Sequence, residues 1–214
     1  MEEVILPLEG TRLGRQEVHA EILDDNSHAL WLRGWIADHR ITNVGDEKAT
    51  QAIESLQTVA TAVDPSGTAT GDEAGIVTAG RSADGHFFVL DDLSVRTTPE
   101  QWAQRTIAAY HKRRASTIVA EANYGGGMVR ATLRAVDSMI PIRLVNATRG
   151  KAVRAEPVSA LYERGLVHHV GIFPELEDEL CEWEPGKASP NRLDALVWVI
   201  TYLMGNTARR ARSH

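Results

Sequence analysis

The chain has 214 residues, of which 43% are hydrophobic and 24% are charged, a composition typical of a folded globular protein. Its length allows one domain with a substantial core. No apolar run approaches the roughly 20 residues that span a bilayer, and the first ten residues lack the pattern of a secretory signal. The single cysteine, Cys181, excludes an internal disulfide and a zinc site built from CxxC pairs. We therefore expect a cytoplasmic protein with no membrane partner.

The net charge of −6 argues at first against nucleic acid as a partner, but the charge is unevenly distributed. Residues 101–154 carry ten Lys or Arg and only two acidic residues, Glu121 and Asp137. Phosphate binding requires a basic face rather than a basic protein, because counterions are released locally. Such charges also solvate ordinary helix surfaces, so charge alone leaves both interpretations open.

Residues 1–57 show no repeating strand pattern. Helices are expected over 11–23 and 29–36, and the stretch 42–57 is polar and weakly patterned. These residues are predicted to form an N-terminal arm or linker, and residues 58–214 the main domain.

From Thr58 onward, strands and helices follow one another closely. Three strands with short connections come first, at 58–63, 74–80 and 85–94. Thr98 is expected to cap a helix that has Pro99 at its first position and runs to about Arg113. The later elements alternate: strand 116–122, helix 128–139, strand 142–147, helix 151–164, strand 166–171 and a last helix from Pro190.

This order predicts an α/β protein with a mixed sheet flanked by helices. The first three strands form an antiparallel meander and the later strands are added by crossovers. Right-handed crossovers place the fourth strand beside the first. The arrangement is that of a ribonuclease-H-like fold.

Three acidic residues occupy positions that surface solvation explains poorly. Asp64 ends the first strand, Glu121 ends the fourth, and Asp194 lies in the first turn of the last helix. Adjacent strand ends place Asp64 and Glu121 close together, and the last helix can bring Asp194 beside them. Each has an ordinary structural explanation, as a turn residue or as a charge at a helix N-terminus. Together they would repel one another unless a cation lay between them.

Oxygen ligands favour Mg²⁺ or Mn²⁺ over zinc. Two such ions could activate a water molecule and stabilise the leaving oxygen of a phosphoryl displacement. Asp64 would bridge both ions, and Glu121 and Asp194 would hold one each. Asp72 is a weaker fourth candidate. Asp91 and Asp92 are expected to end a strand at the surface, with only one of them able to face the site.

Glycines and basic residues near the same sheet edge are candidates for contacts to DNA. The loop 123–127 contains Gly125 and Gly126 and opens a helix, whose free N–H groups suit a phosphate. Glycine is equally common in ordinary turns. The basic candidates lie at the start of one helix and four residues apart on another: Lys151, Arg154, Arg130 and Arg134.

Other reactive side chains are interpreted as structural. His168 and His169 are neighbours on a strand and point to opposite faces, so they cannot chelate one metal side by side. Cys181 is expected to be an incidental, partly buried thiol. The acidic run 175–184 is interpreted as a solvated helix face.

Several ordered blocks resemble the C-terminal nuclease region of phage terminase large subunits, and together they cover nearly the whole chain. They are GTRLGRQE (10–17), ALW (29–31), AVDPSGTATGDEAGIVTAG (62–80), VAEANYGGGMV (119–129), RAEPVSALYERGLVHHVG (154–171), FPELEDELCEWEPG (173–186) and SPNRLDALVW (189–198). The resemblance implies a ribonuclease-H/resolvase-like nuclease that cuts double-stranded viral DNA during packaging with two divalent metals. We expect little sequence preference, because no segment of the sequence has the pattern of a groove-reading element. The acidic positions of the family fall on Asp64, Glu121 and Asp194, with Asp72 as an accessory.

The same resemblance implies the terminase small subunit, the capsid portal and an ATPase domain as partners, in a host cytoplasm. The ATPase motif G-x-x-x-x-G-K-[ST] does not occur in this sequence, so residues 1–57 are expected to be the arm that leads from that domain. Asn191 stands where relatives often place an acid.

Two rival functions are compatible with parts of the sequence. The segment 64–72 imitates the phosphate loop of actin-like ATPases and sugar kinases, which need a second such loop and a longer chain. The other rival is a non-catalytic module that docks on the portal. Loss of one of the three acids would have favoured this function, but all three are present.

Overall fold

The computed structural model describes residues 26, 28–41, 47–65, 73–122, 125–146 and 150–210. The helix expected over 11–23 and the candidate Asp72 lie outside these residues. The described elements are α3 (Arg33–Asp38), α4 (Glu47–Glu54), β1 (Leu56–Asp64), β2 (Glu73–Ser82), β3 (Phe87–Asp92), β4 (Val95–Arg96), α5 (Pro99–Lys112), β5 (Thr117–Glu121), α6 (Gly126–Val136), β6 (Ile142–Val145), α7 (Lys151–Glu163), β7 (Val167–His169), α8 (Pro174–Glu182) and α9 (Asn191–Arg210).

The strands form one mixed sheet in the order β6-β5-β1-β2-β3-β7, with β4 paired to β2. β1, β2 and β3 are the predicted antiparallel meander. β5 pairs in parallel with β1. This confirms the prediction that the fourth of the expected strands lies beside the first. β6 and β7 extend the two edges in parallel. This sheet, with helices on both faces, is the predicted ribonuclease-H-like fold.

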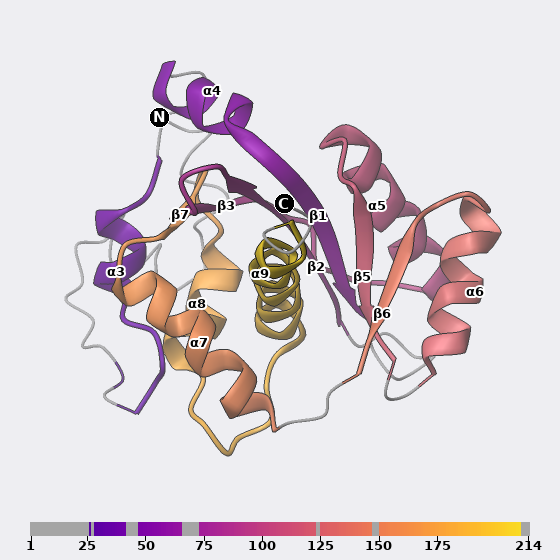
Figure 1. The fold of residues 1–214 in the computed structure, drawn as a ribbon. Helices are drawn as coiled ribbons and strands as arrows, with labels where there is room; N and C mark the ends of the chain where they lie inside the picture. Colours follow the sequence, from indigo (N-terminus) through magenta and orange to yellow (C-terminus); the bar gives the residue numbers. More distant parts are fainter. Residues whose placement is uncertain are drawn as a thin grey trace, which may run out of the picture.

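The helices form two layers, one on each face of the sheet (Figure 1). α5 and α6 cover one face, and α3, α7, α8 and α9 lie over the other. Side chains of β1 alternate between the layers, because successive residues of a strand point to opposite faces. Ala60 and Ala62 join the core beneath α9, whereas Val63 joins the core beneath α5 and α6.

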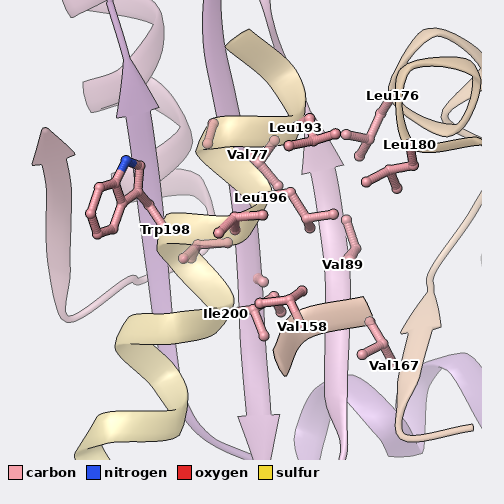
Figure 2. Packing of buried hydrophobic residues seen from close by; sticks show 14 of the residues in the cluster. Val77, Val89, Val158, Val167, Leu176, Leu180, Leu193, Leu196, Trp198 and Ile200 are labelled. Carbon is pink, nitrogen blue, oxygen red and sulfur yellow. The ribbon is translucent and has the colours of Figure 1, made fainter. Parts of the chain in front are cut away.

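The helix α9 is the centre of the larger core. Its predicted stripe is buried as expected, and Leu196 and Ile200 are completely inaccessible to solvent. Figure 2 shows Leu193 and Leu196 packed with Val77 and Val89 of the sheet and with Leu176 and Leu180 of α8. Burial of each such side chain contributes roughly 1.5–3 kcal/mol. This packing holds the N-terminal turn of α9 against the sheet.

The start of α5 shows the predicted capping signals. The Thr98 side chain accepts a hydrogen bond from the backbone N–H of Gln101, and the Gln101 side chain accepts one from the backbone N–H of Thr98. Pro99 occupies the first helical position, where the missing N–H costs nothing. This helix therefore begins where the sequence predicts.

Residues 28–41 lie against α7, α8 and β7. Arg33 pairs with Asp178 at 2.7 Å, and Arg40 pairs with the fully buried Glu177 at 2.6 Å. Ser159 of α7 donates a hydrogen bond to the carbonyl oxygen of Leu30 at 2.5 Å. Residues 28–41 therefore bind to the sheet domain through ion pairs and a hydrogen bond. The domain boundary at residue 58 stays a prediction.

Several details differ from the sequence prediction. The polar stretch 42–57 contains the short helix α4, which was not predicted, and β1 begins at Leu56, two residues before Thr58. The interpretation of 175–184 as a solvated face is wrong for its inner side. Leu176, Leu180 and Cys181 are buried there, and so is Glu177, which binds Arg40. None of the helices in the described part of the chain combines the length and hydropathy needed to cross a membrane.

Candidate functional site

Two carboxylates meet where β1 and β5 end. Val63 and Ala120 are partners in the parallel register, so Asp64 and Glu121 follow side by side. Ala62 and Val119, two residues before each acid, belong to the core beneath α9. Because side chains alternate along a strand, Asp64 and Glu121 point to this same face.

Close packing of α9 on the sheet adds Asp194. Gly75, the partner of Asp64 on β2, lies so near the start of α9 that an added Cβ would stand 1.9 Å from the carbonyl oxygen of Asn191. Only a glycine permits this approach. Asp194 follows in the first turn of the helix and is 2% exposed.

Asp64 interacts electrostatically with the other two carboxylates. Burial raises the pKa of Asp64 from 3.8 to about 7, and the negative charges of Asp194 and Glu121 contribute to the shift. Lys151 and Arg154 oppose it. The structure therefore brings the three predicted acids together, with two predicted cations beside them.

The carboxylate of Asp194 is held by neighbouring donors. Lys151, the first residue of α7, places its Nζ 2.5 Å from Oδ2 of Asp194, and Ser189 donates a hydrogen bond to the same oxygen. The Lys151 side chain is half-exposed, whereas that of Asp194 is buried. The ammonium group supplies the positive charge that a buried carboxylate requires.

A tryptophan that the sequence analysis did not single out contacts Glu121. Trp198 of α9 donates from its Nε1 to Oε2 of Glu121 at 3.1 Å. The guanidinium carbon of Arg154 lies over the Trp198 ring, 4.3 Å from its centroid. A signal was available, because Trp198 follows Asp194 by four residues and therefore shares its side of the helix.

The other DNA-contact candidates lie on α6, which covers the opposite face of the sheet. Gly125 precedes this helix with a φ of 85°, a conformation that favours glycine. An added Cβ on Gly126 would approach Ala122 to 2.8 Å. Arg130 is half-buried one turn into the helix, and Arg134 is exposed further along it. Whether these residues touch DNA stays a prediction.

Asp91 and Asp92 are not at the surface, and this prediction is wrong. Asp91 forms a two-point ion pair with Arg113 at 2.6 and 2.9 Å. Asp92 accepts from Arg192 at 3.0 Å and from the hydroxyl of Ser94. Arginines from distant parts of the chain neutralise both acids.

The two histidines lie in different surroundings, as predicted. His169 is buried, where its Nδ1 contacts Glu177 at 2.9 Å and its Nε2 contacts the Tyr162 hydroxyl at 2.9 Å. His168 stacks on Phe88 and contacts His86 at 2.7 Å. Cys181 is fully rather than partly buried.

The chemistry of the Asp64, Glu121 and Asp194 side chains suits hard divalent cations, which prefer carboxylate oxygens. In the arrangement seen here, no group of three or more His, Cys, Asp or Glu side chains among the described residues is gathered closely enough around one point to hold an ion. Lys151 and Trp198 instead engage two of the carboxylates.

Comparison with known proteins identifies the family. Residues 61–203 match the terminase RNase H-like domain, whereas no curated protein matches the sequence. The nuclease domain of the large terminase subunit gp2 of bacterial virus Sf6 superimposes with a TM-score of 0.55 at 14% identity, covering 79% of this chain and 96% of that one. A variant of the Sf6 domain has been solved with manganese.

The large terminase of bacteriophage HK97 superimposes with a TM-score of 0.58 at 12% identity, covering 81% of this chain but 43% of that one. The family match covers about two thirds of the chain, and these structures share its fold. The chain therefore belongs to the terminase RNase H-like domain family, as its resemblance to phage terminase nucleases predicts.

Proposed function

We propose that this protein is a divalent-metal-dependent endonuclease that cleaves double-stranded viral DNA during genome packaging, with little sequence preference. The observation that carries the proposal is that Asp64, Glu121 and Asp194 lie near one another at the ends of β1 and β5 and the start of α9. The negative charges of Asp194 and Glu121 contribute to the raised pKa of Asp64. Buried like charges are costly, and catalytic sites are where such arrangements are found. Membership of the terminase RNase H-like family supports it.

Asp64, Glu121 and Asp194 would hold two Mg²⁺ or Mn²⁺ ions, with Asp72 as an accessory ligand by family resemblance. Bound there, the ions would activate a water molecule and stabilise the leaving oxygen of the phosphodiester. The manganese in the Sf6 domain supports this choice of cofactor. Lys151 forms an ion pair with Asp194. We therefore expect Lys151 and a divalent cation to compete for the Asp194 carboxylate.

Arg154 is suited to the DNA phosphate. Its Nε and Nη1 atoms are buried and have no hydrogen-bond partner among the described residues. Buried donors without partners are costly, so a ligand that accepts from them would gain affinity. The planar guanidinium group matches phosphate oxygens in geometry and in charge.

The wider biology follows from the family alone. We propose that the small subunit, the capsid portal and a terminase ATPase domain are partners, and that the protein acts in the cytoplasm of an infected host. The sheet domain described here would then be the cutting module of a larger packaging machine.

Cleavage of supercoiled plasmid DNA tests the proposal. We expect nicked and linear products with Mn²⁺ or Mg²⁺, ends that carry 5′-phosphates, and no cleavage in EDTA. Asp64→Asn, Glu121→Gln and Asp194→Asn should each lose at least about 10²-fold in rate. Glu163→Gln, an exposed change at the far end of α7, is the matched control and should cleave normally.

Two results would overturn the proposal. Cleavage that persists in EDTA would exclude metal-dependent chemistry. A well-folded protein that neither cleaves DNA nor responds to Mn²⁺ would favour the non-catalytic docking module.

A further inference from the structure

The side chain of Trp198 joins the acidic and basic parts of the candidate site. It projects from α9 on the other side of the helix from Leu193 (Figure 2) and lies at the β5 side of the same apolar cluster. The residue is 5% exposed, so nearly all of its surface contacts other residues. Its indole edge faces Glu121 and its ring face carries Arg154.

The indole N–H restricts Glu121. It donates to one carboxylate oxygen, Oε2, at 3.1 Å, and no other donor among the described residues bonds to this side chain. The tryptophan side chain has a single donor and no acceptor, so in this hydrogen bond the indole can only donate and the carboxylate can only accept. The bond therefore selects an orientation of the carboxylate and leaves its other oxygen for a different partner.

The indole face restricts Arg154. A guanidinium group 4.3 Å above an aromatic ring is held by a cation–π interaction, which strengthens when water is excluded. The stacking contact occupies the flat face of the guanidinium and leaves two of its edge donors, Nε and Nη1, without a hydrogen-bond partner in the described part of the chain. Edge donors on a fixed plane are suited to two oxygens of one phosphate.

We propose that Trp198 is a positioning residue that couples Glu121 to Arg154, so that divalent cation and DNA phosphate bind cooperatively. This inference rests on the proposed nuclease function. One rigid side chain sets both the carboxylate orientation and the guanidinium plane. A cation that fixes Glu121 therefore favours the Trp198 position that presents Arg154 to a phosphodiester. Linkage requires the reverse effect of phosphate on cation affinity to be equally large.

The test compares Trp198→Phe with Trp102→Phe in the whole chain. Phenylalanine keeps an aromatic ring and removes the N–H group. Trp102 is a fair control because it is also nearly buried, at 3% exposed, but belongs to the core on the other face of the sheet. The Kd for Mn²⁺ is measured by calorimetry on DNA-free protein. We expect it to rise about 10- to 100-fold in Trp198→Phe, as for other groups that orient a ligand, and to stay unchanged in Trp102→Phe.

Cooperativity gives a second readout that a merely structural role would not change. The Kd of a duplex oligonucleotide is measured in EDTA and in Ca²⁺, which is chosen to slow cleavage. In the wild type Ca²⁺ should tighten DNA binding, and in Trp198→Phe this gain should shrink toward none even though Arg154 is retained. In a Glu121→Gln background, Trp198→Phe should have little further effect on Mn²⁺ affinity, because the two changes remove one interaction.

The outcomes separate this inference from the proposed function. Wild-type protein that binds no divalent cation contradicts both. Normal cation binding by the wild type, with Trp198→Phe indistinguishable from Trp102→Phe, contradicts the coupling alone. If Trp198→Phe does not fold, Arg154→Met serves in its place. Loss of the Ca²⁺-dependent gain in DNA affinity in that variant supports the coupling, and retention of the full gain overturns it.

Discussion

Replacement of Gly75 by alanine tests how the candidate site is assembled. The new Cβ would lie 1.9 Å from the carbonyl oxygen of Asn191, 2.4 Å from its carbonyl carbon and 2.9 Å from the backbone nitrogen of Arg192. Contacts below 3.0 Å do not persist in proteins, so β2 and the start of α9 must separate by at least about 1.1 Å. The obstacle is backbone on both sides, and no side-chain rotation relieves it.

Asp194 lies three residues beyond Asn191 and must move with it. Overpacking of this kind costs about 1–3 kcal/mol in the free energy of unfolding. A displacement of about 1 Å in a catalytic group can cost about 10²-fold in rate. We therefore expect Gly75→Ala to fold, to lose about 1–3 kcal/mol in urea denaturation, and to cleave plasmid DNA about 10²-fold more slowly with Mn²⁺.

Gly34→Ala is the matched control. Gly34 lies in α3, and an added Cβ there meets no atom within 4 Å. Alanine favours the helix by up to about 1 kcal/mol relative to glycine, so this variant should be as stable as the wild type or slightly more so, with unchanged cleavage. Gly75→Ala with wild-type stability and rate would refute the argument that close approach of α9 to β2 places Asp194.

Three further changes probe the charges. Lys151→Ala should make the log–log slope of DNA affinity against salt concentration shallower by about 0.9 per lost phosphate contact, and it should also tighten Mn²⁺ binding. Filter binding measures the slope and calorimetry measures the Mn²⁺ affinity; an unchanged value in either would contradict the corresponding role of Lys151. Arg192→Met should lower the free energy of unfolding by about 3 kcal/mol in urea denaturation, because it removes the cation that pairs with three partly or fully buried carboxylates. These are the carboxylates of Glu73, Asp92 and Glu179. A loss below about 1 kcal/mol would contradict this reasoning. Hydrogen bonds from His169 and Arg40 lower the pKa of Glu177 to about 2 despite its burial, so its contribution to stability is complete above pH 4.5 and is lost as the pH falls toward 2. Glu177→Gln should be less stable than the wild type at pH 7 and should lose less stability as the pH falls toward 2. If thermal melts show the same loss of stability with falling pH in both proteins, Glu177 does not have this role.

The strand-end acids were predictable because local signals determine them. Asp64 ends an apolar, β-branched run, and Glu121 ends another, so the sheet order alone places them side by side. The start of the last helix near Pro190 predicts Asp194 at its first turn. Each of these inferences needs only the element type and the chain order.

The partners of other charged residues were not predictable, because they depend on contacts between distant segments. Asp91 is paired with Arg113 across 22 positions, and Glu177 with Arg40 across 137. No local pattern distinguishes these acids from solvated ones. Burial of a carboxylate becomes visible only when the fold brings an arginine to it.

Trp198 is an intermediate case. Its spacing from Asp194 shows that the two share one side of α9, but an aromatic residue on a buried helix usually serves packing. The rotation of α9 decides whether the indole N–H reaches Glu121. Packing of Leu193 and Leu196 against the sheet determines that rotation.

Crystals soaked in Mn²⁺ test the central claim most directly. Anomalous diffraction reports the position of each ion independently of activity. The account predicts one or two peaks between the carboxylates of Asp64, Glu121 and Asp194, with the Lys151 ammonium displaced from Oδ2 of Asp194. Soaked crystals with no peak among these three side chains, or with Mn²⁺ bound only elsewhere and Lys151 still paired to Asp194, would contradict it.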